Sequence, residues 1–592
     1  MKDAWRSLAA VCALVIGVYA YTVHSGFLES LILNAADTYY NLLVQGFRSG
    51  QVSLKKEVPP GLAELADPYD PAANVRYRST PYGVHDLSYY RGKLYLYFGV
   101  TPALILFWPF TALTGHYLFH RQAVAIFCGI GFLAGVGLLC AVWRRYFAEV
   151  SIGVVAACAL ALGLATGVPI LLSSSDVYQV PIGCAYMLTM LALAAIWCAL
   201  HEPERSCRWL AAASVAYGLA VGARPSLLFG AVILLVPVVQ SRPERRQMMA
   251  LLLAATVPIA LISFGLVLYN AARFDNPFEF GMRYQLAGER QATQQFFSLR
   301  YFWFNFRVYF LEPARWSARF PFVHEIAVPS LPAGHSNVEK PFGILTNIPL
   351  VWLAAAVPLA WRGSSGRVGS ILRWFVLATA LLFGVCAMTL GLFCGSNFRY
   401  EMEFLPALVL LAMIGILGLE RALADRPVWR RAGRWGWGLL LGFSMAFNLL
   451  ASLELSTQVR CSVGAALLQT GRVPEAIDQY EQALWIKPDF GEAHNGLGSA
   501  LLQAGQVQGA IGHFQQALRL KPVSAVVYYN LAGAYAAAGR YTEAIAATEK
   551  AVELARAAAQ PELVKKIEAR LELYRRGHAY HQSVEIAGPG QR

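Results

Sequence analysis

A carboxylate, Asp37, is the first candidate for chemistry, because it follows the first apolar stretch of the chain directly. It stands in the run Asn34-Ala-Ala-Asp-Thr-Tyr-Tyr, ahead of an amphipathic segment that closes at Gly50. Ionisable groups at the mouth of a membrane helix are costly unless they are used. The sequence therefore predicts a chemical role for Asp37, with Tyr40 beside it as a binding residue. The alternative is that Asp37 only caps the short helix beginning at Thr38.

A second group of ionisable residues closes the long loop that follows, residues 34–93. His85, Asp86 and Lys93 stand there among several tyrosines. A belt of aromatic residues at the membrane surface explains the tyrosines but not the ionisable side chains beside them. We expect His85, Asp86 and Lys93 to contact a ligand. The alternation of residue types around Arg91-Gly92 predicts a small β-hairpin.

Two arginines stand near the ends of later apolar runs, in Ala223-Arg224-Pro225 and in Phe398-Arg399-Tyr400-Glu401. Guanidinium groups in such places suit an anionic ligand such as a phosphate, which Arg binds bidentately. The competing interpretation of Arg224 is a side chain that snorkels at a break between two short helices. We expect Tyr400 to belong to the same binding set.

Glu401 and Glu403 form the one other pair of carboxylates with a suggestive spacing. Residues at i and i+2 do not share a helix face, so these two alone do not predict a metal site. Glu401 is expected to pair with Arg399 or to lie opposite Asp37. A divalent metal is left open without a clear motif, and no cofactor is firmly implied.

Composition identifies the elements that must position these residues. Of the 592 residues, 57% are hydrophobic and only 14% are charged, and the mean hydropathy is +0.45. Since a crossing takes about 20 apolar residues, we predict an all-α, polytopic membrane bundle of about 11 to 13 spans. The apolar runs lie at 7–33, 97–114, 121–142, 151–172, 179–200, 208–223, 225–240, 248–270, 344–361, 371–394, 402–420 and 436–455, and the stretch 208–240 is short for two crossings.

The charge pattern gives the orientation. The net charge is +13, but Arg and Lys fall in short clusters between the apolar runs, as in the cytoplasmic loops of membrane proteins, which argues against nucleic acid as a partner. With these clusters inside, Asp37, Arg224, Arg399 and the second long loop, 271–343, lie outside. The run 97–114 breaks the alternation, so we expect it to lie in the interface or to re-enter. The ten cysteines show no paired spacing.

After the last apolar run, a period of 34 residues appears. Small residues share one register at Gly464, Gly498 and Ala532, and again at Gly471, Gly505 and Gly539. That period is typical of tetratricopeptide repeats. We predict a membrane domain over 1–455, three repeats over 457–558, and a capping helix with a tail over 559–592. The α-solenoid would bind a protein or peptide partner.

With these motifs placed, residues 1–455 resemble the GT-C superfamily of membrane glycosyltransferases, which take sugars from polyprenyl-phosphate carriers. The resemblance consists of Asp37, the entry Tyr97-Phe-Gly-Val-Thr-Pro, Ala223-Arg-Pro, and Arg399-Tyr with Pro406 following. It implies that Asp37 is the catalytic carboxylate. Together with the repeats, the chain is similar to the tetratricopeptide O-mannosyltransferases, in glycosyltransferase family 39. A single Asp stands where those enzymes have an acidic pair.

We therefore expect a multi-pass protein of the bacterial inner membrane, with its repeats outside the cytoplasm, that moves a sugar from a polyprenyl-phosphate donor to an acceptor hydroxyl with inversion. Asp37 would act as the base. The expected substrate-binding set is Tyr40, His85, Asp86, Lys93, Arg224, Arg399, Tyr400 and Glu401. Two alternatives stay open. One is an O-antigen-ligase-like or polymerase-like transferase that uses the Arg and His residues of loop 271–343; the other is a membrane scaffold without enzymatic activity.

Overall fold

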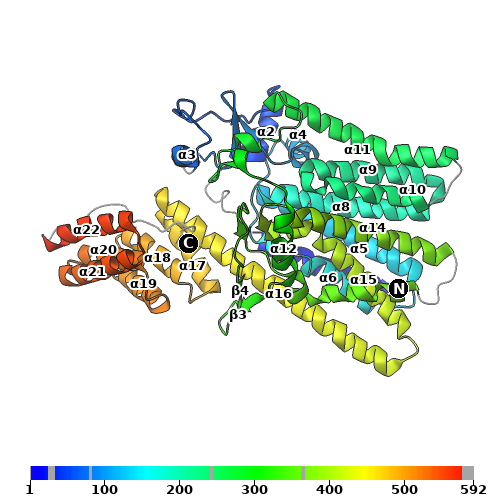
Figure 1. The fold of residues 1–592 in the computed structure, drawn as a ribbon. Helices are drawn as coiled ribbons and strands as arrows, with labels where there is room; N and C mark the ends of the chain where they lie inside the picture. Colours follow the sequence, from blue (N-terminus) through cyan, green and yellow to red (C-terminus); the bar gives the residue numbers. More distant parts are fainter. Residues whose placement is uncertain (1, 24–33, 79–82, 241–244, 362–366, 577–592) are drawn as a thin grey trace. The chain divides into compact units, whose positions relative to one another are not determined.

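The computed structural model describes residues 2–23, 34–78, 83–240, 245–361 and 367–576. The chain divides into two compact units (Figure 1). The first comprises Met1–Ser317 and Val323–Ser452, and the second comprises Ala318–Phe322 and Leu453–Arg592. Each unit is described by itself below.

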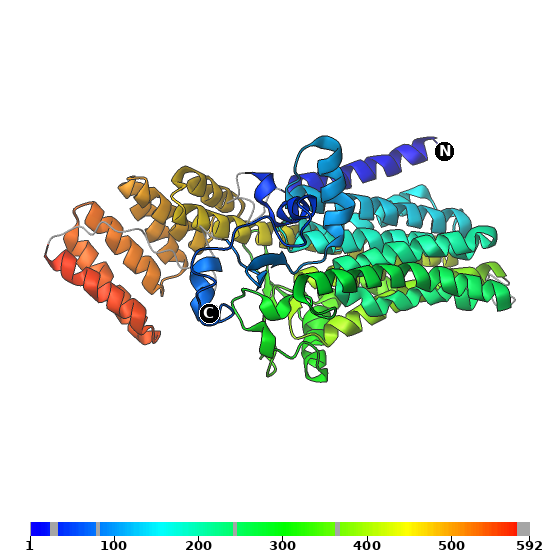
Figure 2. The ribbon, with the colours of Figure 1, turned by 90° about the horizontal axis from the view of Figure 1, so that it is seen from above.

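Helices build the first unit, and in the described part of the chain eight are long and apolar enough to cross a membrane. Most of them run side by side in both ribbon views, while α16 slants relative to the others in Figure 1 (Figures 1 and 2). The predicted fold class, a helical membrane bundle followed by helical repeats, is confirmed. The main helices are α1 (Lys2–Thr22), α5 (His120–Tyr146), α6 (Ile152–Leu164), α7 (Val168–Leu172), α8 (Gln179–His201), α9 (Ser206–Ala223), α11 (Arg245–Phe274), α14 (Arg367–Gly391), α15 (Leu405–Ala422) and α16 (Pro427–Gln469), whose residues from Leu453 on belong to the second unit.

Two further apolar segments wind as tighter 3-10 helices. The helix η4 (Pro225–Leu235) continues into α10 (Val236–Gln240), and η8 (Pro349–Trp361) is of the same kind. A 3-10 helix rises about 2.0 Å per residue instead of 1.5 Å, so η4 and α10 together extend about 30 Å, near the thickness of the hydrocarbon core. This explains how the short stretch 208–240 supplies two antiparallel helices.

The chain before and after the apolar run 97–114 comes back to the same place, at Tyr40. It forms the π-helix η2 (Ala103–Phe107) and α4 (Trp108–Thr114), together only about 18 Å long and too short for a crossing. Tyr40 touches both ends: its hydroxyl donates to the Gly99 carbonyl at 3.1 Å, and its backbone N–H donates to His120 Nε2 at 3.4 Å. This is the geometry expected of a segment that lies in the interface or re-enters.

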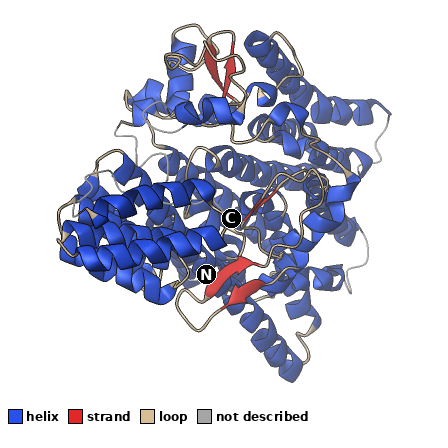
Figure 3. Ribbon diagram, turned by 60° about the vertical axis from the view of Figure 1, so that its left-hand side comes forward, coloured by secondary structure: helices blue, strands red, loops and turns tan. Residues whose placement is uncertain are grey.

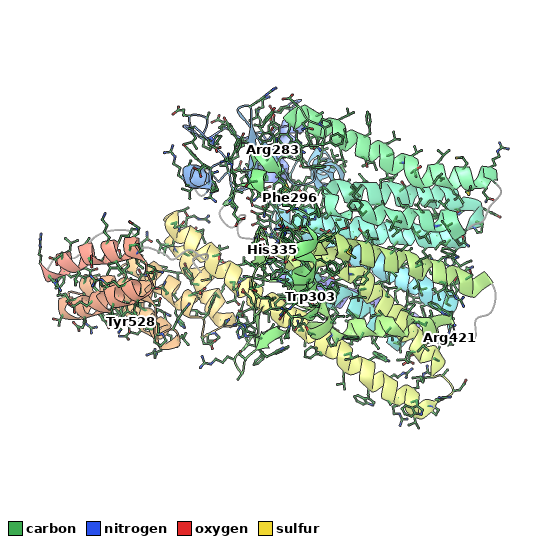
Figure 4. The ribbon with its side chains drawn as sticks, viewed as in Figure 1. Arg283, Phe296, Trp303, His335, Arg421 and Tyr528 are labelled. Atoms are coloured by element: carbon green, nitrogen blue, oxygen red, sulfur yellow. The ribbon has the colours of Figure 1, made fainter. Side chains whose placement is uncertain are left out.

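The contacts between helix termini define two opposite ends of the first unit. At one end, Arg421 binds the Glu149 carboxylate at 3.0 Å and the Ala360 carbonyl at 3.2 Å, and Tyr146 reaches His201 at 2.8 Å. The long loops gather at the opposite end. In Figure 4, Arg421 lies at one end of the bundle, and Phe296 and His335 lie at the other.

The strands are short and all belong to the loop end (Figure 3). The predicted hairpin is confirmed: β1 (Leu87–Tyr90) pairs antiparallel with β2 (Lys93–Leu96). Its turn residues, Arg91 and Gly92, both have positive φ, 46° and 72°, as a two-residue hairpin turn requires. In the second loop, β3 (Ala314–Trp316) and β4 (Val323–Ile326) form another hairpin, and β5 (Val338–Glu339) pairs in parallel with β6 (Ser396–Asn397).

The two long loops are fastened to each other. Ser88 donates its hydroxyl to the Gly281 carbonyl at 2.8 Å, and the Asp86 N–H donates to the Leu286 carbonyl at 3.1 Å. Arg290 also forms an ion pair with Asp67 at 2.7 Å. The first loop is thus held in place by residues almost two hundred positions further along the chain.

The second unit consists of stacked helix pairs. Gly471, Gly505 and Gly539 follow every second helix with φ of +77°, +78° and +74°, the left-handed conformation common where helices stop. Gly498 faces Phe514 so closely that a Cβ atom there would lie 2.8 Å from the ring. The helices are α17 (Val473–Ile486), α18 (Gly491–Gln503), α19 (Val507–Leu520), α20 (Ala525–Ala537), α21 (Tyr541–Ala557) and the capping helix α22 (Pro561–Arg575).

Candidate active site

Arg224 stands at the tip between α9 and η4, with its guanidinium committed to Glu403. Nε and Nη2 lie 2.7 and 2.6 Å from the same carboxylate oxygen, Oε1. The guanidinium carbon also lies 4.9 Å from the ring centre of Tyr400. The Glu403 side chain is only 2% exposed, and its other oxygen, Oε2, is buried without a hydrogen-bond partner among the described residues. This ion pair is therefore nearly excluded from solvent on its acidic side.

The fold of the helix that bears Arg399 explains which residues meet. The segment η9 (Phe398–Glu403) is a 3-10 helix, in which residues three apart lie on the same face. Tyr400 and Glu403 therefore share the face that meets Arg224. Residues 399 and 401 lie on different faces, as residues at i and i+2 do in any helix.

Arg399 is held from both sides. Asn397 caps η9 and accepts from the Arg399 N–H at 3.0 Å and from its Nε at 2.9 Å. Glu339, on β5, pairs with Nη2. The Arg399 side chain is 12% exposed, whereas that of Glu339 is 43% exposed. The counterion of Arg399 is thus much more accessible than that of Arg224.

Tyr178 joins the first loop to Arg399. Its hydroxyl donates to Asp86 Oδ2 at 2.6 Å, and its ring centre lies 4.9 Å from the Arg399 guanidinium carbon. His85 Nε2 lies 3.4 Å from the same Asp86 oxygen. Burial raises the pKa of Tyr178 well above its usual range, and the Asp86 carboxylate raises it further. At neutral pH the hydroxyl therefore remains a donor to Asp86.

Tyr97 connects the two arginine groups. Burial raises its pKa, the charge of Asp86 adds to the rise, and the charges of Arg224 and Arg399 oppose it. Gly99 allows the backbone after Tyr97 to pack closely against Ala223, since a Cβ atom at position 99 would lie 2.2 Å from the Ala223 carbonyl oxygen. The structure thus brings together Asp86, Arg224, Arg399 and Tyr400 from the expected set, with His85 at the edge. We call Asp86, Tyr97, Tyr178, Arg224, Arg399 and Tyr400 the arginine cluster.

Asp37 stands apart from this cluster. It ends the short helix η1 (Ala35–Asp37) and is exposed. Thr38 is the N-cap residue of α2 (Tyr39–Arg48), with no capping bond from a side chain, so the capping alternative does not account for Asp37. Its charge acts on Lys56, whose pKa burial lowers and Asp37 partly restores. Within the described ranges, no hydrogen bond or ion pair joins its carboxylate to the arginine cluster.

A path through Tyr39 nevertheless ties the Asp37 segment to the first-loop residues. The Tyr39 hydroxyl donates to the backbone carbonyls of Gly83 at 2.9 Å and His85 at 3.2 Å. The pKa of Tyr39 is raised by burial and also by the charges of Asp86 and Asp176. Asp37 therefore lies two residues before Tyr39, a side chain whose pKa is raised by the charge of Asp86.

Three other expected binding residues have different environments. Tyr40 is fully buried, with its ring stacked on Phe107 at 5.1 Å between centres, which gives it a packing role. Lys93 is exposed at the start of β2. Glu401 is buried and accepts from the Phe342 N–H at 3.0 Å, and burial raises its pKa well above the usual range. The expected pairing of Glu401 with Arg399 is wrong.

The Arg and His residues of the second loop mostly serve its own structure. Arg307 binds Glu312 at 2.5 Å. Arg315 and His324 are cross-strand neighbours on β3 and β4, where Arg315 donates to the Glu325 carbonyl at 2.8 Å. Arg283 is exposed. His335 is buried elsewhere in the loop, with Nε2 3.1 Å from Asn305. In the part of the chain that the structure describes, no contact gathers these side chains into one site.

Five residues of the site were not in the expected set: Tyr97, Tyr178, Glu339, Asn397 and Glu403, the last of which was considered only for a metal site. Asn397 offers a signal, because Asn just before a helical turn is a common N-cap. Tyr97 lies in the aromatic entry motif. Glu339 lies in a long loop, and nothing in its sequence surroundings distinguishes it from the other carboxylates there. As to metals, the described residues contain no group of three or more His, Cys, Asp or Glu side chains arranged to hold an ion.

The chain is a polytopic helical membrane protein by its fold, with helical repeats in its second unit. A tetratricopeptide repeat family model matches residues 464–525 and 496–561, which confirms the predicted repeats. No curated protein matches the chain significantly.

Among solved structures, the chain is similar to the tetratricopeptide domain of Sgt2 from Aspergillus fumigatus, with 23% identity over 22% of this chain and 91% of that one, at a TM-score of 0.18. A thermophilic tetratricopeptide protein from Thermus thermophilus shows 21% identity over 27% of this chain and 90% of that one, with a TM-score of 0.18. An oligosaccharyltransferase from Archaeoglobus fulgidus shows 10% identity over 78% of this chain and 58% of that one, with a TM-score of 0.39. The function of the membrane unit therefore has to be inferred from its own residues.

Proposed function

We propose that this chain is a membrane glycosyltransferase that moves a sugar from a polyprenyl-phosphate donor to an acceptor hydroxyl. The supporting observation is the arginine cluster, in which Arg399 faces the ring of Tyr178, the donor to Asp86, and Arg224 faces the ring of Tyr400. The cluster lies at the loop end of an apolar helix bundle. A lipid-linked phosphate needs an apolar surface for its tail and cations for its leaving group. Both features meet at this end of the first unit.

Arg399 is the leading candidate to hold the phosphate. Its partner Glu339 is 43% exposed, while the partner of Arg224 is 2% exposed. Displacing a solvated carboxylate by a phosphate costs less than separating a buried ion pair. Arg224 would keep Glu403 and contribute its positive charge from a fixed position. Tyr400, stacked on Arg224, and His85, beside Asp86, would line the same space.

Asp37 is the proposed base, because its carboxylate is exposed and makes no hydrogen bond or ion pair within the described residues. The acceptor hydroxyl would lose its proton to Asp37, and its oxygen would form a bond to the anomeric carbon. The bond from that carbon to the phosphate oxygen breaks, and polyprenyl phosphate leaves with the electron pair. Attack opposite the leaving group inverts the anomeric centre. Base assistance of this kind contributes roughly 10² to 10⁴-fold.

Asp86 has a different proposed role. It accepts a short hydrogen bond from Tyr178 at 2.6 Å and lies near His85, so its carboxylate is already committed. Through Tyr178, Asp86 positions Arg399. Both aspartates lie at the loop end, which we place outside the cytoplasm of a bacterial inner membrane. The repeats would bind a protein or peptide on that same side.

The test is transfer of labelled sugar in proteoliposomes, from a panel of polyprenyl-phosphate sugars and nucleotide sugars. We expect transfer from a lipid-linked donor, with the donor KM raised at least tenfold in Arg399→Gln, since the lost contact is a charge-assisted hydrogen bond. Arg283→Gln, which changes an exposed arginine outside the cluster, is the matched control. Transfer from nucleotide sugars alone, or equal donor KM values in the two variants, would contradict the proposal.

A further inference from the structure

The second loop contains an open, polar pocket of about 360 Å³ that the arginine cluster does not use. Its walls come from residues 289–301 on one side and from Gly334, His335 and Ser336 on the other. In Figure 4, His335 lies with Phe296 at the loop end of the bundle. A volume of this size is at the lower end of the range for ligand pockets, and suits a small ligand such as one or two sugar rings.

The lining indicates the kind of ligand. Five lining residues carry flat polar groups, and no aliphatic side chain lines the pocket within the described part of the chain. Flat amide, carboxylate and guanidinium groups can bind neighbouring hydroxyls in pairs, and a lining of this kind offers little contact for an apolar side chain of a peptide. The lining therefore favours a saccharide over a peptide. The five residues are Glu289, Arg290, Gln294, Gln295 and Arg300.

One arginine of the pocket, Arg300, has no carboxylate partner in the described ranges. Arg290 is paired with Asp67 at 2.7 Å. Arg300 is exposed, and in the described ranges no carboxylate lies within ion-pair distance of its guanidinium. Glu289, the one acidic residue in the lining, offsets the charge of Arg300 but does not form an ion pair with it. The Arg300 guanidinium is therefore available to an anionic group on the ligand, and Arg suits a carboxylate best because it binds both oxygens.

His335 adds an unused acceptor to the pocket wall. The Asn305 amide donates to three backbone carbonyls, of Leu390, Gly391 and Phe393, at 3.2, 3.1 and 2.7 Å. Its oxygen therefore faces His335 Nε2 at 3.1 Å, so Nε2 carries the hydrogen and Nδ1 the lone pair. Nδ1 is buried and has no hydrogen-bond partner among the described residues. A ligand hydroxyl, or a water that bridges to it, would satisfy this atom.

A short strand connects the pocket to the arginine cluster. Ser336 donates its backbone N–H to the Cys394 carbonyl at 2.8 Å, and the following residues pair with β6. Glu339, the partner of Arg399, stands four residues beyond His335. At about 3.3 Å per residue, the two lie no more than about 13 Å apart along the chain. One ligand of a few sugar units could span this distance.

We propose that this pocket binds an acidic saccharide, with Arg300 on its carboxylate and Gln294 and Gln295 on its hydroxyls. The identity of this ligand rests on the proposed function: the saccharide is part of the acceptor, and its reacting hydroxyl is directed toward the arginine cluster. Binding itself does not depend on turnover. The pocket can therefore be tested separately from the transfer reaction.

The experiment measures binding to the full chain in nanodiscs by saturation-transfer NMR, with three probes. They are methyl β-D-glucuronide, the isosteric neutral methyl β-D-glucoside, and an N-acetylated aspartyl dipeptide. We expect the glucuronide to bind about tenfold more tightly than the glucoside, and Arg300→Gln to remove that preference. Arg283→Gln, at an exposed arginine outside the pocket, should keep it.

Equal binding of the two glycosides, or a glucuronide preference that survives Arg300→Gln, would overturn the proposal. Tighter binding of the dipeptide would also overturn it, in favour of a peptide site. The transfer assay reports on the proposed function independently. Glucuronide binding without any lipid-linked transfer would support the pocket proposal and contradict the proposed glycosyltransferase function. Transfer without glucuronide binding would support the function and contradict the pocket proposal.

Discussion

The two arginines of the cluster should respond very differently to the same substitution. Arg224→Met leaves Glu403 with its charge buried, because that side chain is 2% exposed and its Oε2 already lacks a partner. Removing one member of a buried pair costs about 3 to 5 kcal/mol. Arg399→Met leaves Glu339, which is 43% exposed and stays hydrated. The loss of a solvated pair costs about 1 kcal/mol or less.

A double variant separates the ion pair from the fold. When Arg224→Met is combined with Glu403→Met, both charges leave together, and apolar side chains of similar size fill the space. Replacement of a whole buried pair is often neutral for stability. We therefore expect the double variant to recover most of the about 3 kcal/mol lost by Arg224→Met alone. It should remain inactive in transfer, because the fixed positive charge is gone.

Unfolding in mixed detergent micelles, followed by tryptophan fluorescence, measures these free energies. The four proteins to compare are the native chain, the two single Arg→Met variants and the double variant. If both single variants lose the same free energy within about 0.5 kcal/mol, a difference too small for the contrast between buried and exposed pairs, the burial argument is refuted. A double variant less stable than Arg224→Met would refute it as well.

Three further predictions concern single groups. Burial lowers the pKa of His335 from 6.5 to about 4, so the unfolded chain binds a proton at a higher pH than the folded chain does. The contribution of this group to the free energy of unfolding is present above pH 6.5, and about 2 kcal/mol of it is lost between pH 7 and pH 5. The loss should be smaller in His335→Gln. Gly498→Ala should destabilise the repeats by crowding Phe514, whereas Gly512→Ala, with open space around it, should raise stability by up to about 1 kcal/mol in thermal unfolding. Tyr178→Phe should slow transfer about tenfold with little change in melting temperature, since it removes one hydrogen bond to a charged group.

The parts of the molecule that depend on local pattern could be predicted from the sequence. The period of 34 residues identifies the repeats, because small residues recur where helices cross, as at Gly498 against Phe514, and glycines with positive φ recur where helices end, as at Gly505. The hairpin follows from Arg91-Gly92, whose positive φ values suit a tight turn. Arg224 and Arg399 stood out because each stands alone at an end of an apolar run predicted to lie outside, away from the basic clusters of the inner side.

The partners of those residues could not be predicted in the same way. Arg224 and Glu403 are 179 positions apart, and Arg399 and Glu339 are 60 apart, so their pairing depends on the tertiary fold. The expectation that Glu401 pairs with Arg399 was wrong because both side chains find partners elsewhere in the chain: Glu401 accepts from the Phe342 N–H, and Arg399 pairs with Glu339. The 3-10 winding of residues 398–403 aligns Tyr400 with Glu403 instead. Tyr40 was expected at the site because it stands near Asp37, but its ring is buried against Phe107.

The most direct test of the account is lipid-linked transfer by Asp37→Asn, measured in proteoliposomes beside the native chain and Asp86→Asn. We expect Asp37→Asn to lower kcat by roughly 10² to 10⁴-fold with an unchanged melting temperature. Asp86→Asn should mainly raise the donor KM, because it acts through Tyr178 and Arg399. Unchanged kcat in Asp37→Asn, with the loss found in Asp86→Asn instead, would contradict the assignment of the base, and no transfer by the native chain from any lipid-linked donor would contradict the function.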